Sequence, residues 1–208
     1  MNMPNTGGLY AITDCENISA DELLSKTESI LRVGVALFQY RNKTDDQSKK
    51  QALAIELQSL CKQYITPFIV NDDLKLAKAI AADGIHLGQH DTNIETARKV
   101  LGDKIIGISC YNDFNRAVSA EQSGADYIAF GSFFQSATKP DAAKANIELI
   151  IKSKEKFNIP VVAIGGITPE NGKQLINAKV DFLAIINGIY STDDAAASTL
   201  AYNNLFIT

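Results

Sequence analysis

The sequence predicts an α/β fold, with residues 1–208 forming a single domain that is a (β/α)8 barrel, the TIM barrel. Eight short apolar runs recur along the chain, and segments with helical periodicity separate them. Each run is almost continuously apolar, which is typical of parallel strands covered on both faces. No linker or low-complexity stretch interrupts the alternation. Eight consecutive strand–helix units favour a closed barrel over an open doubly wound sheet, the main alternative.

The expected strands are rich in Val, Ile, Phe and Tyr, the residues that pack well in a buried sheet. In chain order they cover residues 9–13, 35–40, 67–70, 84–87, 105–109, 127–132, 160–166 and 182–188.

Helix signals fill the gaps between these runs. Ser19 and Glu22 form a capping-box pattern, and Gly34 marks the end of the first helix. Thr168 is a candidate N-cap followed by Pro169 at the first helical position. The expected helices lie within residues 19–34, 45–64, 73–82, 93–102, 113–124, 143–157, 168–178 and 192–205.

Composition narrows the classes of partner and the compartment. The chain is 46% hydrophobic and carries a net charge of −4, so it lacks the basic field that attracts nucleic acid or membrane surfaces. Cys15, Cys61 and Cys110 form no C-x-x-C pair, which indicates a reducing compartment. No secretory signal or membrane-spanning run is visible, so we expect a cytoplasmic protein. It could form a homo-oligomer, a dimer, because barrels of this size often pair.

A barrel places its active site on the loops that follow the strands. Gln39, Arg41 and Lys43 alternate along the end of the second run, so their side chains share one face. A guanidinium beside an ammonium suits the oxygens of a phosphate or diphosphate. A polar edge exposed to water is the alternative interpretation.

Carboxylates follow the third and fourth runs. Asn71, Asp72 and Asp73 come directly after the third run, and Asp91 follows the fourth. One acid can serve as an N-cap for the next helix, and Asp73 is a candidate for that function. Asp72 and Asp91 would then stand at neighbouring strand ends, where two carboxylates suit Mg²⁺ together with phosphate oxygens.

Two further features of the same rim carry weaker signals. A zinc site from His86, His90 and Asp91 would need three convergent ligands that the sequence does not reveal, so we expect His86 to pack and His90 to face solvent. Gly165-Gly166 and Asn187-Gly188 end the last two strands, where such barrels bind phosphate through backbone N–H groups.

The motifs "LYAITD", "QYRNK", "NDDLKLAKAIAADGIHLGQHD", "IGIS", "GADYIAFGSFFQSATK" and "VVAIGGI" together resemble the thiamine phosphate synthase (thiamine-phosphate pyrophosphorylase) family over nearly the whole chain. The resemblance implies a transferase of thiamine biosynthesis. It would condense 4-amino-2-methyl-5-(diphosphooxymethyl)pyrimidine with a thiazole phosphate, or its carboxylated form, and release pyrophosphate. Magnesium would be the cofactor.

The resemblance also implies a function for individual residues. Arg41 and Lys139 would act electrostatically on the departing diphosphate, and Asp72 and Asp91 would hold Mg²⁺. The pyrimidine diphosphate would contact Gln39, Tyr40, Arg41, Asn42, Lys43, Asn71, Ser109 and Lys139. The thiazole phosphate would contact Ser136, Ala137, Thr138, Gly166, Ile186 and Asn187.

Three positions depart from the family pattern, which usually has Thr at Ser136, Ser at Asn187 and often His at Tyr111. Ser136 keeps the hydroxyl, the Asn187 amide can still hydrogen-bond phosphate, and Tyr111 is assigned no function. The alternatives are a thiazole tautomerase-like paralogue and a barrel that only binds thiamine intermediates. Paired acids such as Asp72 and Asp91 are generally lacking in the tautomerase.

Overall fold

Eight parallel strands close into a barrel in the computed structural model of the chain, which describes residues 3–4, 6–16, 18–44, 46–135 and 145–207. Each strand pairs with the next one along the chain, and the last pairs with the first. The strands are β1 (Gly8–Ile12), β2 (Leu37–Tyr40), β3 (Phe68–Asn71), β4 (Gly84–Leu87), β5 (Ile105–Tyr111), β6 (Tyr127–Gly131), β7 (Val161–Ile164) and β8 (Phe182–Ile185). This confirms the predicted (β/α)8 barrel.

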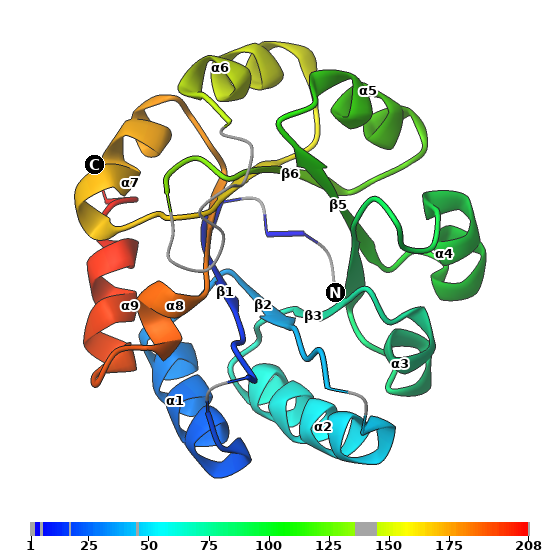
Figure 1. Ribbon diagram of the computed structural model, residues 1–208, viewed down its shortest axis with the longest axis vertical. Coiled ribbons are helices and arrows are strands. Elements are labelled where there is room, and N and C mark those ends of the chain that lie inside the picture. Colours follow the sequence, from blue (N-terminus) through cyan, green and yellow to red (C-terminus); the bar gives the residue numbers. More distant parts are fainter. Residues whose placement is uncertain (1–2, 5, 17, 45, 136–144, 208) are drawn as a thin grey trace.

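Helices form a ring outside the strands (Figure 1). Their caps follow the sequence signals: Ser19 accepts a hydrogen bond from the Glu22 N–H, and Thr168 forms a complete capping box with Asn171. The helices are α1 (Ala20–Val33), α2 (Gln47–Gln63), α3 (Leu74–Ala79), α4 (Ile94–Leu101), α5 (Phe114–Gln122), α6 (Ile147–Lys156), α7 (Pro169–Asn177), α8 (Asn187–Tyr190) and α9 (Ala195–Asn203).

The chain after β8 differs from the prediction. Ile186, Asn187 and Gly188 were expected to extend the last strand, but β8 ends at Ile185 and the short helix α8 begins at Asn187. The expected final helix is α9. The short helix therefore turns the chain away from the barrel directly at the rim.

Two apolar layers hold the barrel together. Residues such as Leu9 and Ala11 of β1 point outward, into the large core between the sheet and the helices. Tyr10 and Ile12, which alternate with them, belong to a second core inside the barrel with Phe182 of β8. The interior of the barrel is therefore filled with side chains, as in other barrels of this size.

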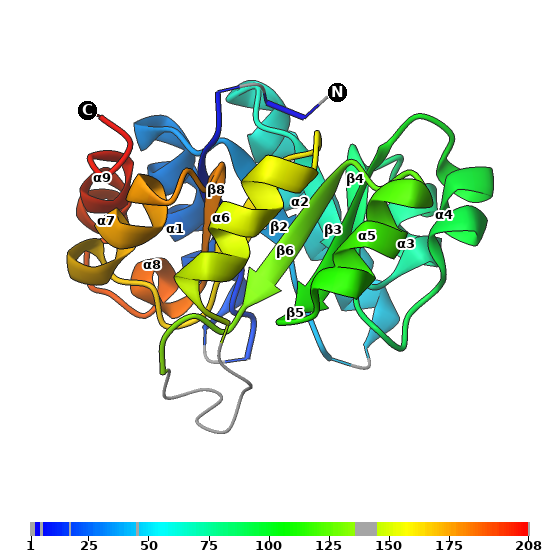
Figure 2. The same ribbon diagram turned by 90° about the horizontal axis from the view of Figure 1, so that it is seen from above.

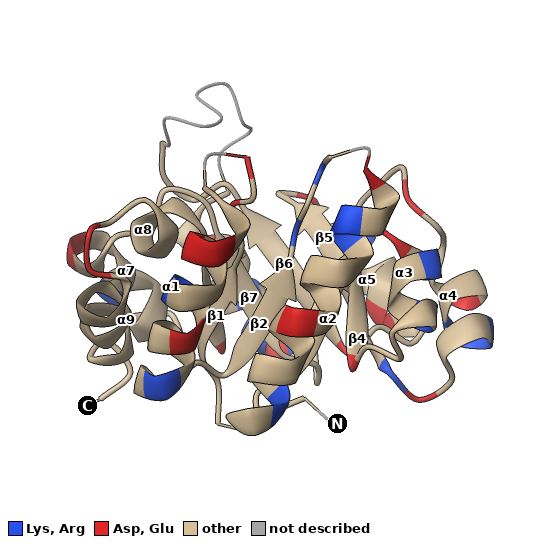
Figure 3. Ribbon diagram, turned by 90° about the horizontal axis from the view of Figure 1, so that it is seen from below, with Lys and Arg blue, Asp and Glu red and all other residues tan. Residues whose placement is uncertain are grey.

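All strands run in the same direction, so their C-terminal ends meet at one rim, as the arrowheads of β5 and β6 show in Figure 2. On the side of the molecule shown in Figure 3, acidic and basic residues are interspersed, in keeping with the small net charge. Among the described residues, no helix has both the length and the apolarity needed to cross a membrane.

Candidate active site

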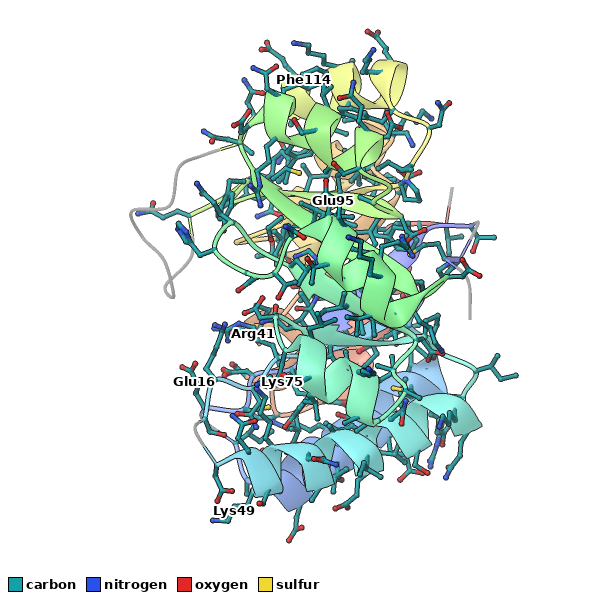
Figure 4. All side chains as sticks on the ribbon, turned by 90° about the vertical axis from the view of Figure 1, so that its right-hand side faces the viewer. Glu16, Arg41, Lys49, Lys75, Glu95 and Phe114 are labelled. Atoms are coloured by element: carbon teal, nitrogen blue, oxygen red, sulfur yellow. The ribbon has the colours of Figure 1, made fainter. Side chains whose placement is uncertain are left out.

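The segment after β2 brings three predicted residues to the rim. Gln39 is buried inside the barrel end, whereas Arg41 and Lys43 follow it with increasing exposure. Thr13, directly after β1, holds this segment: its hydroxyl accepts from the Arg41 N–H at 2.8 Å and donates to the Arg41 carbonyl at 3.0 Å. The Arg41 guanidinium lies 3.8 Å from Glu16, and Figure 4 shows the two side by side at the edge of the barrel.

The side chains of Tyr40 and Asn42 turn away from the barrel interior. Tyr40 is buried in the core between sheet and helices, where its hydroxyl donates to the Lys50 carbonyl at 3.0 Å. Asn42 donates to the Tyr40 hydroxyl at 2.8 Å and accepts from the Thr44 N–H at 2.9 Å. The side chains of both residues are therefore engaged in hydrogen bonds within the protein.

The two adjacent acids after β3 have different functions. Asp73 is the N-cap of α3: its carboxylate accepts from the Leu76 N–H at 2.9 Å and from Lys50 at 2.8 Å. Asp72 has a positive φ of 61°, which Asp tolerates better than most residues, and its N–H donates to the His86 carbonyl at 2.9 Å. This backbone turn frees the Asp72 side chain from capping.

The Asp72 carboxylate meets Lys43 and Asp91 at the rim. Lys43 donates a hydrogen bond to Asp72 and forms an ion pair with it. Partial burial raises the pKa of Asp72, but the hydrogen bonds from Lys43 and Asp91 outweigh burial and leave that pKa below its usual value. Burial and the contact with Asp72 raise the pKa of Asp91. The Gly88 N–H fixes Asp91 by donating to its carboxylate at 2.6 Å.

This pair fits a divalent cation. Two carboxylates in contact repel each other when both are ionised, and Lys43 supplies only one compensating charge. No cluster of three or more His, Cys, Asp or Glu side chains suited to a metal occurs within the described part of the chain. Magnesium needs only one or two carboxylates, because waters and substrate phosphate oxygens complete its coordination.

Sequence reasoning missed a polar chain inside the barrel. Tyr10 and Tyr127 share a hydrogen bond of 2.8 Å between their hydroxyls, and Gln39 Nε2 donates to Tyr10 at 2.6 Å. His86 contacts the Tyr127 hydroxyl through Nδ1 at 2.9 Å and the Ser109 hydroxyl through Nε2 at 2.8 Å.

The two histidines differ in environment. His90 is exposed, as expected, but His86 uses both ring nitrogens for hydrogen bonds as well as packing in the interior. Burial lowers the pKa of His86 to about 4, although the negative charge of Asp72 opposes the shift. The sequence held one sign of this network: His86, Tyr10 and Tyr127 are polar residues on the inward faces of otherwise apolar strands.

The remaining predicted residues lie at other strand ends. Asn71 ends β3 and pairs in register with His86 of β4. Gly166 follows β7 with a φ of 64°, and a Cβ there would lie 2.6 Å from the carbonyl oxygens of Phe134 and Gln135. Ile186 and Asn187 open α8 after β8, the strand paired with β7. Ser136, Ala137, Thr138 and Lys139 lie outside the described residues.

The geometry defines two regions on one rim. On one side, Lys43, Asp72 and Asp91 offer opposite charges suited to a diphosphate with a cation. On the other, the chain after β7 has Gly166, where a side chain would not fit, and the chain after β8 begins the helix α8 at Asn187. Backbone N–H groups at such turns suit a second phosphate group.

Comparisons with known proteins show the family of the chain. Residues 9–189 match the family described as thiamine monophosphate synthase. The thiamine-phosphate synthase of Nitrosococcus oceani is 46% identical over 200 residues, covering 96% of this chain and 92% of the relative. That of Thiobacillus denitrificans is 44% identical over 201 residues, covering 96% of this chain and 95% of the relative.

Solved structures give the same result. The thiamine phosphate pyrophosphorylase from Pyrococcus furiosus superposes with a TM-score of 0.89 at 32% identity, covering 98% of this chain and 96% of the other. KGPDC from Streptococcus mutans, at 17% identity and a TM-score of 0.78, shares the fold alone. From the match over residues 9–189 and these relatives, the chain belongs to the thiamine monophosphate synthase family.

Proposed function

We propose that the chain is a thiamine-phosphate synthase. It joins 4-amino-2-methyl-5-(diphosphooxymethyl)pyrimidine to a thiazole phosphate, or its carboxylated form, and gives thiamine phosphate and pyrophosphate. The observation that carries this proposal is the meeting of Lys43, Asp72 and Asp91 at the rim of a barrel of this family. The curated relatives named above, similar over almost their whole length, support it.

The first substrate would lie against the segments after β2, β3 and β5. Arg41, Lys43 and Lys139 would neutralise the diphosphate, Ser109 would donate a hydrogen bond to it, and Gln39 and Asn71 would orient the pyrimidine end. Tyr40 and Asn42 would contribute through their backbone, because their side chains point elsewhere. Asp72 and Asp91 would hold Mg²⁺, which when bound adds positive charge beside the leaving group.

The chemistry needs charge stabilisation more than proton transfer. The bond between the pyrimidine CH₂ group and the diphosphate oxygen breaks, and its electron pair leaves with the diphosphate. The electron-rich aminopyrimidine stabilises the resulting cation, and the thiazole nitrogen forms the new bond to the same carbon. Arg41 and Lys139 would stabilise the departing anion electrostatically. No protein nucleophile or general base is needed.

The thiazole phosphate would bind where the loops after β6, β7 and β8 meet. Gly166, Ile186 and Asn187 would receive its phosphate, together with Ser136, Ala137 and Thr138. The positive φ of Gly166 and its closeness to the carbonyls of Phe134 and Gln135 support a backbone site here, since a side chain would not fit.

The same proposal extends to the whole chain. Residues 1–208 would form one catalytic domain, acting in the cytoplasm on phosphorylated small molecules. Free Cys15, Cys61 and Cys110 support a reducing compartment. Pairing into a dimer stays a prediction, as does the absence of nucleic-acid and membrane partners.

Incubation of the protein with each substrate alone and with both tests the proposal. Thiamine phosphate and pyrophosphate should appear together, in equal amounts, only when both substrates and Mg²⁺ are present. Equal product in the presence of chelator would refute the metal site. No product with both substrates would refute the synthase and favour the tautomerase-like or purely binding alternatives.

A further inference from the structure

We propose that the buried chain Gln39–Tyr10–Tyr127–His86–Ser109 has one fixed hydrogen-bond direction, which makes His86 the Nε2–H tautomer and Ser109 a donor to the bound substrate. Tyr10, Tyr127 and His86 are then positioning residues that act through Ser109 and Gln39. The direction follows from the contacts inside the barrel. Only the identity of the ligand that Ser109 meets rests on the proposed function.

The chain crosses the inside of the barrel from one wall to another. It starts on β2 at Gln39, passes through Tyr10 of β1 and Tyr127 of β6, and reaches β4 and β5 at His86 and Ser109. The consecutive distances are 2.6, 2.8, 2.9 and 2.8 Å. Four of the members are buried, with exposed fractions between 0 and 9%, while Ser109 is partly exposed.

The direction is set at the Gln39 end. An amide nitrogen can only donate, so the Tyr10 hydroxyl oxygen accepts from Gln39. The other hydrogen-bond partner of the Tyr10 hydroxyl among the described residues is the Tyr127 hydroxyl, and the Tyr10 proton therefore goes to Tyr127. If Tyr127 donated to Tyr10 instead, the Tyr10 proton would have no acceptor among these contacts, which is unfavourable in a residue only 1% exposed.

The remaining protons follow in turn. Tyr127, having accepted from Tyr10, donates to Nδ1 of His86, and this nitrogen must carry no proton. In the neutral ring the proton is then on Nε2, which donates to the Ser109 hydroxyl oxygen. Among the protons of these five residues that form the hydrogen-bond chain, only the Ser109 hydroxyl proton then has no acceptor in the chain. It can therefore point to a ligand.

The same direction suits the ligand at the Ser109 end. Oxygens of a diphosphate accept hydrogen bonds and cannot donate them, so a hydroxyl beside them must donate. Ser109 can do so while its oxygen is occupied by His86. The opposite direction would turn Ser109 lone pairs toward the anion. The two ends of the chain therefore require the same arrangement of protons for separate reasons.

Packing fixes the rings that transmit this direction. The Tyr10 and Tyr127 rings meet edge to face, with centroids 5.9 Å apart, and His86 stacks on Tyr127 at 5.6 Å. Gly107 makes room for Tyr127, because a Cβ there would lie 1.9 Å from Cζ of its ring. The side chains are therefore held in place before a ligand arrives, and the site has little orientational entropy left to lose.

Nitrogen NMR of the ligand-free protein reads the direction directly. The polypeptide has only two histidines, so in a His90→Asn variant the remaining imidazole signals belong to His86. At neutral pH, His86 Nδ1 should resonate as an unprotonated acceptor and Nε2 as a protonated nitrogen. Tyr127→Phe should shift the Nδ1 signal, because it removes the donor. A proton on Nδ1 in the unsubstituted protein would overturn the proposal.

Kinetics test the positioning function. Tyr127→Phe should lower kcat/KM for the pyrimidine diphosphate about tenfold and leave KM for the thiazole phosphate unchanged. The same substitution in a Ser109→Ala background should have little further effect, because both changes act on one contact. Tyr190→Phe is the matched control: it removes a buried hydroxyl bonded to Thr27 at 3.1 Å, outside the chain.

The outcomes separate the two proposals. Equal kinetic losses in Tyr127→Phe and Tyr190→Phe, or additive losses with Ser109→Ala, would show a merely structural function and overturn the positioning proposal. A protein without synthase activity would refute the proposed function and with it Ser109 as a donor to this substrate. The tautomer of His86 would still decide the direction of the chain.

Discussion

Asp72 and Asp73 show how adjacent residues of one type acquire different functions. The Asp73 carboxylate accepts from the Leu76 N–H, so it is occupied by the start of α3. The positive φ at Asp72 turns its side chain toward Lys43 and Asp91 instead. The sequence predicted both functions, helix capping and cation binding, because acidic side chains are suited to each. The assignment of each function to one residue depended on the backbone, which propensity does not specify.

Lys43 provides a prediction at the same scale. Lys43→Gln should raise KM for the pyrimidine diphosphate by roughly tenfold, because it removes a charge-assisted contact to an anion and leaves Asp72 without its partner. Steady-state kinetics with each substrate varied in turn would measure this, and KM for the thiazole phosphate should not change.

Lys49→Gln is the control for Lys43. Lys49 is 88% exposed, pairs with Asp46 at 3.3 Å, and lies on the outer helix α2 (Figure 4). Its loss should leave both KM values as they are. A Lys43→Gln protein that behaves like Lys49→Gln would remove Lys43 from the binding site.

His86 shows that the sequence around one residue does not reveal its long-range hydrogen bonds. A histidine inside an apolar strand suggested packing, and the ring does pack, stacked on Tyr127. The ring also hydrogen-bonds Tyr127 and Ser109, and through them it belongs to a network that includes four other strands, with bonded pairs up to 117 positions apart in the sequence. Such a network becomes visible only when the barrel closes and the inward faces of β1, β2, β4, β5 and β6 meet.

At the scale of elements, three strand pairs share one pattern of hydrogen bonds at the end of the barrel opposite the site. An acid just before β4, β6 and β8 accepts from a backbone N–H at the start of the preceding strand. These contacts join Asp83 to Phe68 at 3.0 Å, Asp126 to Ile106 at 2.7 Å and Asp181 to Val161 at 2.7 Å. Each acid also donates its own N–H to the carbonyl of the same partner. These paired contacts therefore fix the register of each strand pair near its start.

A substitution at Asp126 tests this pattern of hydrogen bonds. Asp126→Ala should lower the free energy of unfolding by about 1–3 kcal/mol, because it leaves the Ile106 N–H without an acceptor and breaks the ion pair with Arg98. Denaturant unfolding would measure the loss, with exposed Asp103→Ala as the control. Both variants should keep the KM values of the unsubstituted protein. Equal stability of the two variants would contradict this function for Asp126.

At the scale of the whole molecule, the sequence predicted the order of strands and helices. It also predicted which charged residues would gather at the rim. The period of apolar runs predicted the eight strands, and the caps at Ser19 and Thr168 predicted two helix starts. Because strand ends of a parallel barrel converge, Lys43, Asp72 and Asp91 could be expected near one another, and the structure brings them together.

Other parts of the site were not predictable for physical reasons. Tyr40 and Asn42 lie in a rim segment, yet the alternation of the strand and a local turn direct their side chains outward. The helix α8 replaced the expected end of the last strand, since apolar residues such as Ile186 fit a strand and a helix equally well. These features depend on tertiary packing, which a local pattern does not contain.

The central claim is that Asp72 and Asp91 hold a magnesium ion against the diphosphate, and a Mg²⁺ titration of turnover with both substrates saturating tests it most directly. Asp73→Asn is the matched control, because Asn also caps helices. The Mg²⁺ concentration for half-maximal turnover should rise at least about tenfold in Asp72→Asn and in Asp91→Asn, and stay unchanged in Asp73→Asn. Titration curves for Asp72→Asn and Asp91→Asn that coincide with that of Asp73→Asn would contradict the claim.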